Sequence, residues 1–162
     1  MGNKLITNLL IVHQHPKVLL GMKKRRFGVG RWNGFGGKVL DGETIEECLV
    51  REVEEEAGIK LDKFEKVGIL EFEFSEGGQG IEAHVFKTDQ FIGEPKETEE
   101  MKPQWFFIDE IPFDQMWPDD AFWMPLFLKG KKFKGKFLLD RPSNAEYQAK
   151  ILEKELEEVE NI

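Results

Sequence analysis

The sequence contains almost no cysteine, little histidine and no long apolar segment. Cys48 is the only cysteine among 162 residues, so the chain cannot form an internal disulfide or a thiolate metal cage. The three histidines do not have metal-ligand spacing. No apolar run is long enough to cross a membrane, and the first residues lack the apolar core of a secretion signal. We therefore expect a cytoplasmic protein without a membrane partner.

Basic residues are also scarce relative to acidic ones. Lys and Arg number 23 against 31 Asp and Glu, which gives a net charge of −8 and leaves no basic stripe. Phosphate contacts dominate binding to long nucleic acids, so such a partner is not expected. Hydrophobic residues at 40% and aromatic residues at 12% are instead typical of a globular protein. The length predicts a single domain over residues 1–162, as a monomer with a dimer left open.

Residues 44–58 have the pattern of a capped helix. Thr44 is followed three residues later by Glu47, which is the spacing of a capping box. No glycine or proline interrupts residues 44–57, and Gly58 then supplies a helix stop. The sequence therefore predicts one helix whose two ends are both defined.

This helix carries carboxylates at the margin of its apolar stripe. At about 100° per residue, Ile45, Leu49 and Val53 share one face. Glu52 and Glu56 lie at the edge of that face. Two carboxylates about 4 Å apart repel by roughly 4 kcal/mol at an effective dielectric near 20. A divalent cation that neutralises them is therefore expected, and Mg²⁺ accepts a few carboxylates together with waters and phosphates.

Other charges on the helix leave an alternative open. Glu55 lies on the same flank as the two marginal carboxylates. A merely solvated acidic face would explain Glu46, Glu47 and Glu54 well, but it explains the other three glutamates poorly. Arg51 can pair with Glu47 or Glu55 at four-residue spacing.

A longer pattern surrounds the helix. It consists of Gly37, five residues, Glu43, seven residues, Arg51-Glu52-Val53, one residue, Glu55-Glu56, one residue and Gly58-Ile59. Every fixed position of the Nudix box is filled, so the chain resembles the Nudix hydrolases, which use Mg²⁺ (with Mn²⁺ as the alternative ion) to split a diphosphate linkage. The resemblance implies a metal site formed by Gly37, Glu52, Glu55, Glu56 and Glu100. It also implies catalytic roles for Glu56, Glu52, Glu100 and Arg51, in which the arginine orients a carboxylate.

Strand-like segments occur at residues 5–13, 18–23, 64–74, 81–87, 104–108 and 132–139. In one of them Leu70, Phe72 and Phe74 alternate with glutamates, which is typical of a strand. A second helix is predicted after Pro118, and the acidic residues 143–162 are predicted as a C-terminal helical tail. The expected fold class is α/β (α+β), a mixed sheet sandwiched between helices.

Further segments resemble one branch of the Nudix family, the MutT-like enzymes that hydrolyse oxidised purine nucleoside triphosphates in mammals. The matching segments are 19–25, 30–38, 72–74, 84–86, 100–101 and 116–120. The resemblance implies that the substrate contacts Lys23, Phe27, Asn33, Phe72, Phe74, Met101, Trp117, Asp119, Asp120 and Trp123. Two close buried carboxylates cannot both ionise easily, so Asp119 and Asp120 would offer one proton donor and one acceptor to the base. From the residues alone, helix N-capping is the alternative role of this pair.

The resemblance implies a nucleoside triphosphate partner and a function. Oxidised purine nucleoside triphosphates, such as 8-oxo-dGTP and 2-oxo-dATP, would be cleaved to the monophosphate and pyrophosphate, which would clear damaged nucleotides from the pool. One alternative is a Nudix hydrolase for a methylated purine nucleotide, ADP-ribose or a dinucleoside polyphosphate. The other is a non-catalytic nucleotide-binding module.

Overall fold

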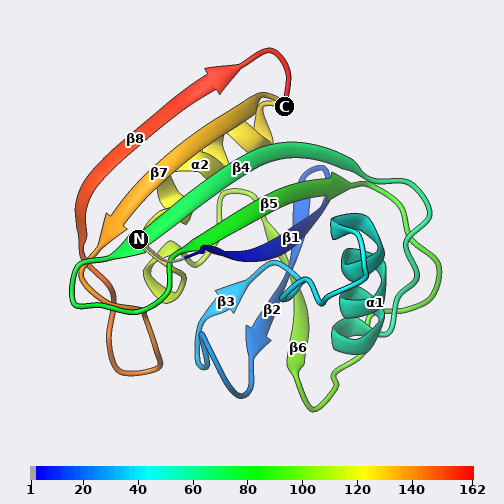
Figure 1. The fold of residues 1–162 in the computed structure, drawn as a ribbon. Helices are drawn as coiled ribbons and strands as arrows, with labels where there is room; N and C mark the ends of the chain where they lie inside the picture. The colour runs from blue at the N-terminus through cyan, green and yellow to red at the C-terminus, as the bar shows by residue number, and fades with distance from the viewer. Residues whose placement is uncertain (1–2) are drawn as a thin grey trace.

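The computed structural model describes residues 3–162 and has an eight-stranded mixed sheet at its centre (Figure 1). The strands are β1 (Leu5–Gln14), β2 (Lys17–Lys23), β3 (Trp32–Asn33), β4 (Glu65–Phe74), β5 (Ile81–Thr88), β6 (Met101–Phe107), β7 (Lys132–Leu139) and β8 (Ile151–Val159). Their order is β3-β2-β1-β5-β4-β7-β8, and β6 pairs with β2. The pairs β1–β5 and β4–β7 are parallel, and the other pairs are antiparallel.

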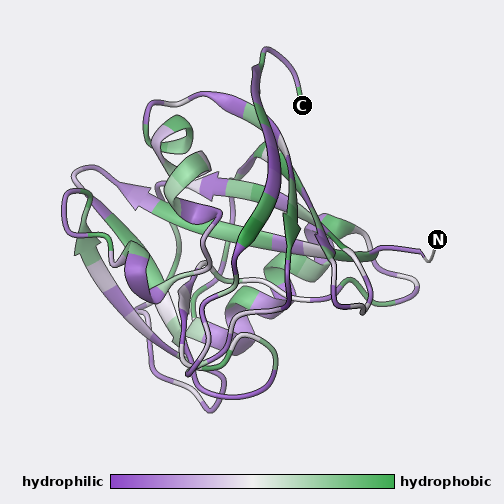
Figure 2. Cartoon of the chain, turned by 90° about the vertical axis from the view of Figure 1, so that its left-hand side faces the viewer, coloured by the Kyte–Doolittle hydropathy of each residue, from purple (hydrophilic) through white to green (hydrophobic). Residues whose placement is uncertain are grey.

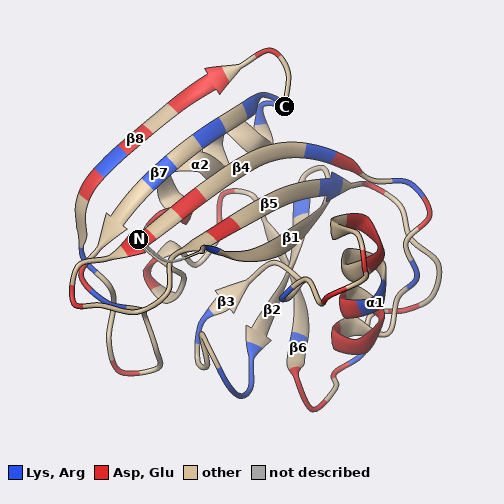
Figure 3. Cartoon of the chain, viewed as in Figure 1, with Lys and Arg blue, Asp and Glu red and all other residues tan. Residues whose placement is uncertain are grey.

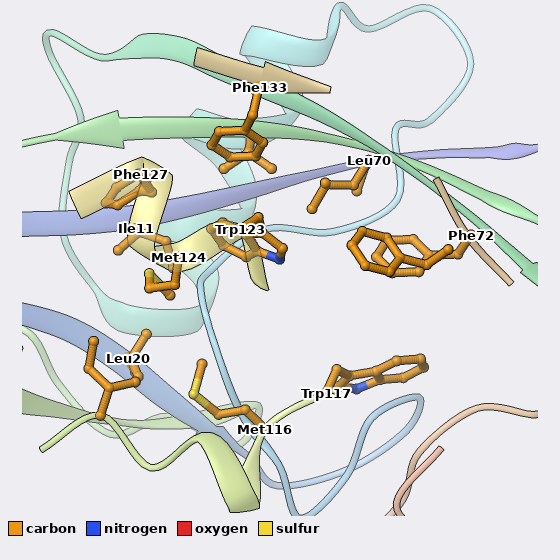
Figure 4. Packing of buried hydrophobic residues seen from close by; sticks show 14 of the residues in the cluster. Ile11, Leu20, Leu70, Phe72, Met116, Trp117, Trp123, Met124, Phe127 and Phe133 are labelled. Carbon is orange, nitrogen blue, oxygen red and sulfur yellow. The ribbon is translucent and has the colours of Figure 1, made fainter. Parts of the chain in front are cut away.

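Two helices cover opposite faces of this sheet. They are α1 (Ile45–Ala57) and α2 (Asp120–Leu128), and a 3-10 turn, η1 (Phe113–Gln115), precedes α2. Adjacent residues of β1 point to the two faces in turn, because Leu10 packs with Leu49 of α1 whereas Ile11 packs with Trp123 of α2. Figure 4 shows the cluster on the α2 side. The predicted mixed sheet between helices is therefore confirmed.

Helix α1 has both of its predicted ends. The Thr44 hydroxyl accepts from the Glu47 N–H at 3.0 Å, and the Glu47 carboxylate accepts from the Thr44 N–H at 2.8 Å. At the other end, Gly58 adopts a left-handed φ of 71° and donates its N–H to the Glu54 carbonyl. The capping box and the glycine stop are confirmed, so the orientation of the helix is set by local sequence.

The predicted strands are also confirmed, with ends that differ by a few residues. Two strands were not expected: β3, which lies inside the glycine-rich loop after β2, and β8 at the C-terminus. Within residues 3–162, none of the helices is both long enough and apolar enough to span a membrane.

The predicted C-terminal helical tail is wrong. Residues 151–159 form β8, which pairs with β7 at the end of the sheet order. Lys134 lies opposite Glu157 and Lys136 lies opposite Glu155, and opposite charges facing each other across a ladder are stabilising. Figure 2 shows that β8 is hydrophilic over most of its length, and Figure 3 shows the facing basic and acidic bands. Glu, Leu and Lys favour helices in isolation, so only the partner strand decides the outcome.

Candidate functional site

A cavity of about 740 Å³ runs from helix α1 to the start of helix α2, across strands β1, β4 and β5. This volume falls within the range of small-ligand sites, roughly 300–1,000 Å³. The predicted site residues that line it are Lys23, Phe27, Asn33, Gly37, Glu52, Glu56, Phe72, Phe74, Met101, Trp117, Asp119 and Asp120. The remaining predicted residues, which are Arg51, Glu55, Glu100 and Trp123, are not part of this lining.

The glycine-rich loop before α1 is fastened to strand β1. Leu10 and Phe35 exchange two backbone hydrogen bonds of 2.6 and 2.9 Å. Asn8 donates its backbone N–H to the Gly37 carbonyl at 3.1 Å, and its side-chain oxygen accepts from the Gly37 N–H at 2.9 Å. A Cβ atom at Gly37 would lie 2.6 Å from Cδ of Glu52. Glycine thus allows the Glu52 carboxylate to pack directly against the loop, and a side chain at position 37 would displace the end of that glutamate.

Asn8 also joins this loop to the helix, and the sequence analysis missed it. Its side-chain amide donates to the Ile45 carbonyl in the first turn of α1 at 3.0 Å, and the residue is 4% exposed. A buried polar group needs such partners. The available signal was an uncharged amide in the middle of a strand that is otherwise largely apolar.

Glu56 is the most deeply buried carboxylate of α1. The residue is 3% exposed, and Oε1 accepts from the Gly36 N–H at 2.8 Å. Oε2 lies 3.8 Å from the Lys23 ammonium. Burial raises the pKa of Glu56 to about 8, although the Gly36 hydrogen bond and Lys23 act in the opposite direction. A divalent cation beside this carboxylate would favour its ionised form.

Glu52 lies one turn away and is held by Arg51. The distance from Arg51 Nη1 to Glu52 Oε1 is 2.9 Å, and burial raises the pKa of Glu52. Arg51 also bonds Glu43 at 2.8 Å and reaches Glu55 at 3.4 Å. The predicted pairing with Glu55 is thus confirmed, whereas Glu47 is used by the helix cap. The contact supports the hypothesis that the arginine orients a carboxylate.

The other two predicted ligands, Glu55 and Glu100, are not part of the cavity lining. The Glu55 side chain is 57% exposed. Glu100 accepts from Arg25 Nε at 2.9 Å, and this hydrogen bond is the main reason that the pKa of Glu100 is lowered. Within residues 3–162, no three His, Cys, Asp or Glu side chains are arranged as a ready metal site. The ligand roles implied for Glu55 and Glu100 stay predictions. Of the three helix carboxylates expected to face inward, Glu52 and Glu56 line the cavity and Glu55 does not.

Those two carboxylates still suit a metal. They line the cavity together with the backbone of Gly37, which packs against Glu52. Carboxylate and carbonyl oxygens are hard donors of the kind that Mg²⁺ and Mn²⁺ prefer. The donor chemistry at this end of the cavity thus fits a divalent cation with open positions for water and phosphate.

The opposite end of the cavity is aromatic. The Trp117 ring lies 5.4 Å from the Phe27 ring, 6.5 Å from Phe72 and 6.4 Å from Phe74, measured between centroids. Figure 4 shows Trp117 and Phe72 on the same side of the cluster. Such a set of rings can hold a flat heterocycle by stacking.

Asn33 and Lys23 enter the cavity from neighbouring strands. Asn33 of β3 pairs with Gly21 of β2, and Lys23 ends β2. The Asn33 side-chain oxygen accepts from the Gly34 N–H at 2.9 Å, which fixes the orientation of the amide. The amide is thereby positioned to meet a polar ligand edge.

Asp119 and Asp120 are both 3% exposed at the start of α2. Asp119 makes no side-chain cap hydrogen bond. Its Oδ2 accepts from Trp123 Nε1 at 2.8 Å, while Oδ1 of Asp119 and Oδ2 of Asp120 have no partner within the described chain. N-capping is therefore not the role of the Asp119 side chain. Two unsatisfied buried oxygens that line a cavity indicate a ligand with polar edges.

Trp123 requires a correction. The resemblance implied that it closes the pocket, but it is fully buried behind Asp119 and stacks on Phe133 at 5.5 Å. It positions the Asp119 carboxylate and does not reach the cavity.

Comparison with known proteins shows the family of this chain. The family model described as the NUDIX domain matches residues 4–127. The oxidized purine nucleoside triphosphate hydrolase of Mus musculus is 52% identical over 137 residues, which cover 85% of this chain and 88% of the relative. The protein of the same name from Danio rerio is 49% identical over 160 residues, which cover 99% of this chain and 98% of the relative.

Solved structures of similar fold agree with membership of the NUDIX family. The crystal structure of a MutT protein from Bacillus halodurans matches with a TM-score of 0.74 and 28% identity, covering 94% of this chain and 97% of that protein. A NUDIX hydrolase from Nitrosomonas europaea matches with a TM-score of 0.70 and 23% identity, covering 80% and 92%, and shows the same fold.

We expect Asp120→Asn to stabilise the protein by roughly 1–3 kcal/mol at neutral pH and to have little effect near pH 4. Burial raises the pKa of Asp119 to about 6 and that of Asp120 well above its ordinary value of 3.8. The folded protein therefore binds more protons than the unfolded chain above about pH 4, so its stability falls as the pH rises through the folded pKa values. Asparagine keeps the shape of the protonated carboxyl and removes this titration.

Urea unfolding between pH 4 and pH 8 measures the effect, with the exposed Asp89→Asn as the matched control. Identical pH dependence in the wild type and in Asp120→Asn would contradict the assignment.

Proposed function

This chain belongs to the Nudix hydrolase family, and from that premise we propose that it cleaves oxidised purine nucleoside triphosphates to the monophosphate and pyrophosphate. The single observation that carries the proposal is the layout of the cavity. Two helix carboxylates lie at one end, and an aromatic set with two buried aspartates lies at the other. A purine nucleoside triphosphate has the same layout, with charge at one end and a flat polar ring at the other.

The base end accounts for the choice of oxidised purines. The ring stacks against Trp117, and Asn33 bonds one polar edge. A protonated Asp120 donates to the base while Asp119, held by Trp123 Nε1, accepts from it. Oxidation at C8 or C2 exchanges donors and acceptors on the purine edge, and a pair that shares a proton can match more than one such pattern.

The phosphate end supplies binding and proton transfer. Members of this family generally need a divalent metal, and we propose Mg²⁺, with Mn²⁺ as the alternative, held by Glu52, Glu56 and the backbone of Gly37. The bound cation neutralises phosphate charge and makes water more acidic. Arg51 holds Glu52 in place, and Lys23 contacts phosphate. A carboxylate of Glu52 or Glu56 takes the proton from the attacking water. We further propose that the protein works in the cytoplasm, where it removes damaged nucleotides.

The proposal is tested by chromatographic analysis of the products formed from a panel that contains 8-oxo-dGTP, 2-oxo-dATP, dGTP, a methylated purine triphosphate, ADP-ribose and a dinucleoside polyphosphate. Only the triphosphates can release pyrophosphate, whereas the last two would yield nucleotides and, from ADP-ribose, a sugar phosphate. With Mg²⁺ present, we expect the highest kcat/KM for the oxidised triphosphates. Without a divalent ion, we expect no turnover of any substrate. Glu56→Gln should lower kcat by about 10²–10⁴-fold while nucleotide binding and folding persist. The exposed neighbour Glu54→Gln is the matched control and should retain activity.

A different substrate at the top of the panel would replace the proposed specificity. Near-normal turnover by Glu56→Gln would remove the assigned role of that carboxylate.

The base end predicts a loss of selectivity when its contacts are removed. Trp117→Ala should raise KM for the oxidised triphosphates by about 5–100-fold, because stacking on an aromatic ring contributes roughly 1–3 kcal/mol. Asp119→Asn should also raise KM for the oxidised triphosphates, because it removes the carboxylate oxygen that accepts a hydrogen bond from the base. Steady-state kinetics on oxidised and normal dGTP measure both effects, with the exposed Phe122→Ala as the control. Unchanged discrimination between the two nucleotides would show that this end of the cavity does not hold the base.

A further inference from the structure

Four consecutive cations, residues 23–26, end β2 and enter the loop toward β3, and this loop is basic in Figure 3. Two of them are bound outside the cavity. The Lys24 ammonium lies 2.7 Å from both the Glu97 carboxylate and the Thr98 carbonyl, and the Arg25 guanidinium is bonded to Glu100. Arg26, in contrast, lines the cavity.

The backbone of Arg26 is strained. Its φ is 68°, and it is the only residue other than glycine with a positive φ between residues 3 and 162. The loop nearby uses Gly28 and Gly30 for the same left-handed conformation, which a Cβ atom disfavours. Glycine would fit position 26 without strain, so the arginine side chain is expected to provide something that offsets this cost.

The side chain of Arg26 lies at the cavity with most of its donors unpaired within the described chain. It lines the cavity, and it is 69% exposed. Within the described chain it makes one hydrogen bond, from Nη1 to Glu100 at 3.3 Å. A guanidinium has five N–H donors in a fixed plane, so most of its donors remain available to a ligand.

The position of Arg26 is between the two ends of the cavity. The next residue, Phe27, packs against Trp117 at the aromatic end. Glu100, the ion-pair partner of Arg26, lies 3.9 Å from Lys23. Lys23 in turn lies 3.8 Å from Glu56 at the carboxylate end. A chain of phosphates that joins a base at Trp117 to a cleavage site at Glu56 would pass beside this guanidinium.

We propose that Arg26 is a substrate-binding residue that contacts the triphosphate and selects it over the monophosphate product. The inference rests on the proposed function and adds a residue to it. Guanidinium and phosphate form paired, charge-assisted hydrogen bonds. Glu100 holds the guanidinium at the cavity until the more highly charged phosphates compete for it.

The test compares the wild type with Arg26→Gly and Arg26→Lys by isothermal titration with Mg²⁺. The probes are a non-hydrolysable imido analogue of 8-oxo-dGTP and the monophosphate 8-oxo-dGMP. Arg26→Gly should bind the triphosphate analogue about tenfold more weakly and the monophosphate within twofold of the wild type. Its Tm should rise by about 2–4 °C, because the strain is gone. Arg26→Lys keeps the charge and the strain but loses the paired hydrogen bonds, so it should bind the triphosphate analogue with an affinity between those of the wild type and Arg26→Gly, without the gain in Tm.

The exposed Lys63→Gln, which removes one charge away from the cavity, controls for net charge and should leave both affinities unchanged. Equal triphosphate affinity of the wild type and Arg26→Gly would overturn the assignment while the proposed function stands. A wild-type protein that bound no purine triphosphate would overturn both.

Discussion

The site depends on the docking of the glycine-rich loop between strand β1 and helix α1. Asn8 bonds the loop at Gly37 and the helix at Ile45, and the Gly36 N–H is donated to the buried carboxylate of Glu56. Hydrogen bonds are strengthened where water is excluded and the local dielectric is low. The helix is aligned by its own caps, so these few contacts are sufficient to aim its carboxylates into the cavity.

Stability is given up at both ends of the cavity. Burial raises the pKa of Glu52, Glu56, Asp119 and Asp120, and the neighbouring carboxylate adds to the rise at Glu56 and Asp120. Natural proteins retain destabilising features of this kind where function requires them. A cation at one end and a polar base at the other would offset them, which makes the ligand-bound state the one in which the buried charges are satisfied. The strained backbone of Arg26 lies between these ends, and its cost in stability would likewise be offset when the arginine contacts the ligand.

Local features were predictable from the sequence, and features that depend on distant partners were not. The helix ends at Thr44 and Gly58 follow from capping chemistry, and the strands follow from alternation. The segment 151–159 has no local signal for a strand, because its strand state depends on pairing with β7 and on packing of Ile151 and Leu156 against the core. In the same way, the helical wheel placed Glu52 and Glu56 at the edge of the buried face, but it could not show that Arg25 pairs with Glu100 or that Trp123 donates to Asp119.

The central claim is that the docked loop and helix α1 together aim two carboxylates at a shared divalent ion. A crystal structure with Mn²⁺ and a non-hydrolysable oxidised purine triphosphate tests it most directly, because anomalous scattering locates the ion independently of the model. The account predicts manganese in contact with Glu52 and Glu56, with the Gly36 N–H still bonded to Glu56. Manganese bound elsewhere, with both carboxylates turned to solvent, would contradict it.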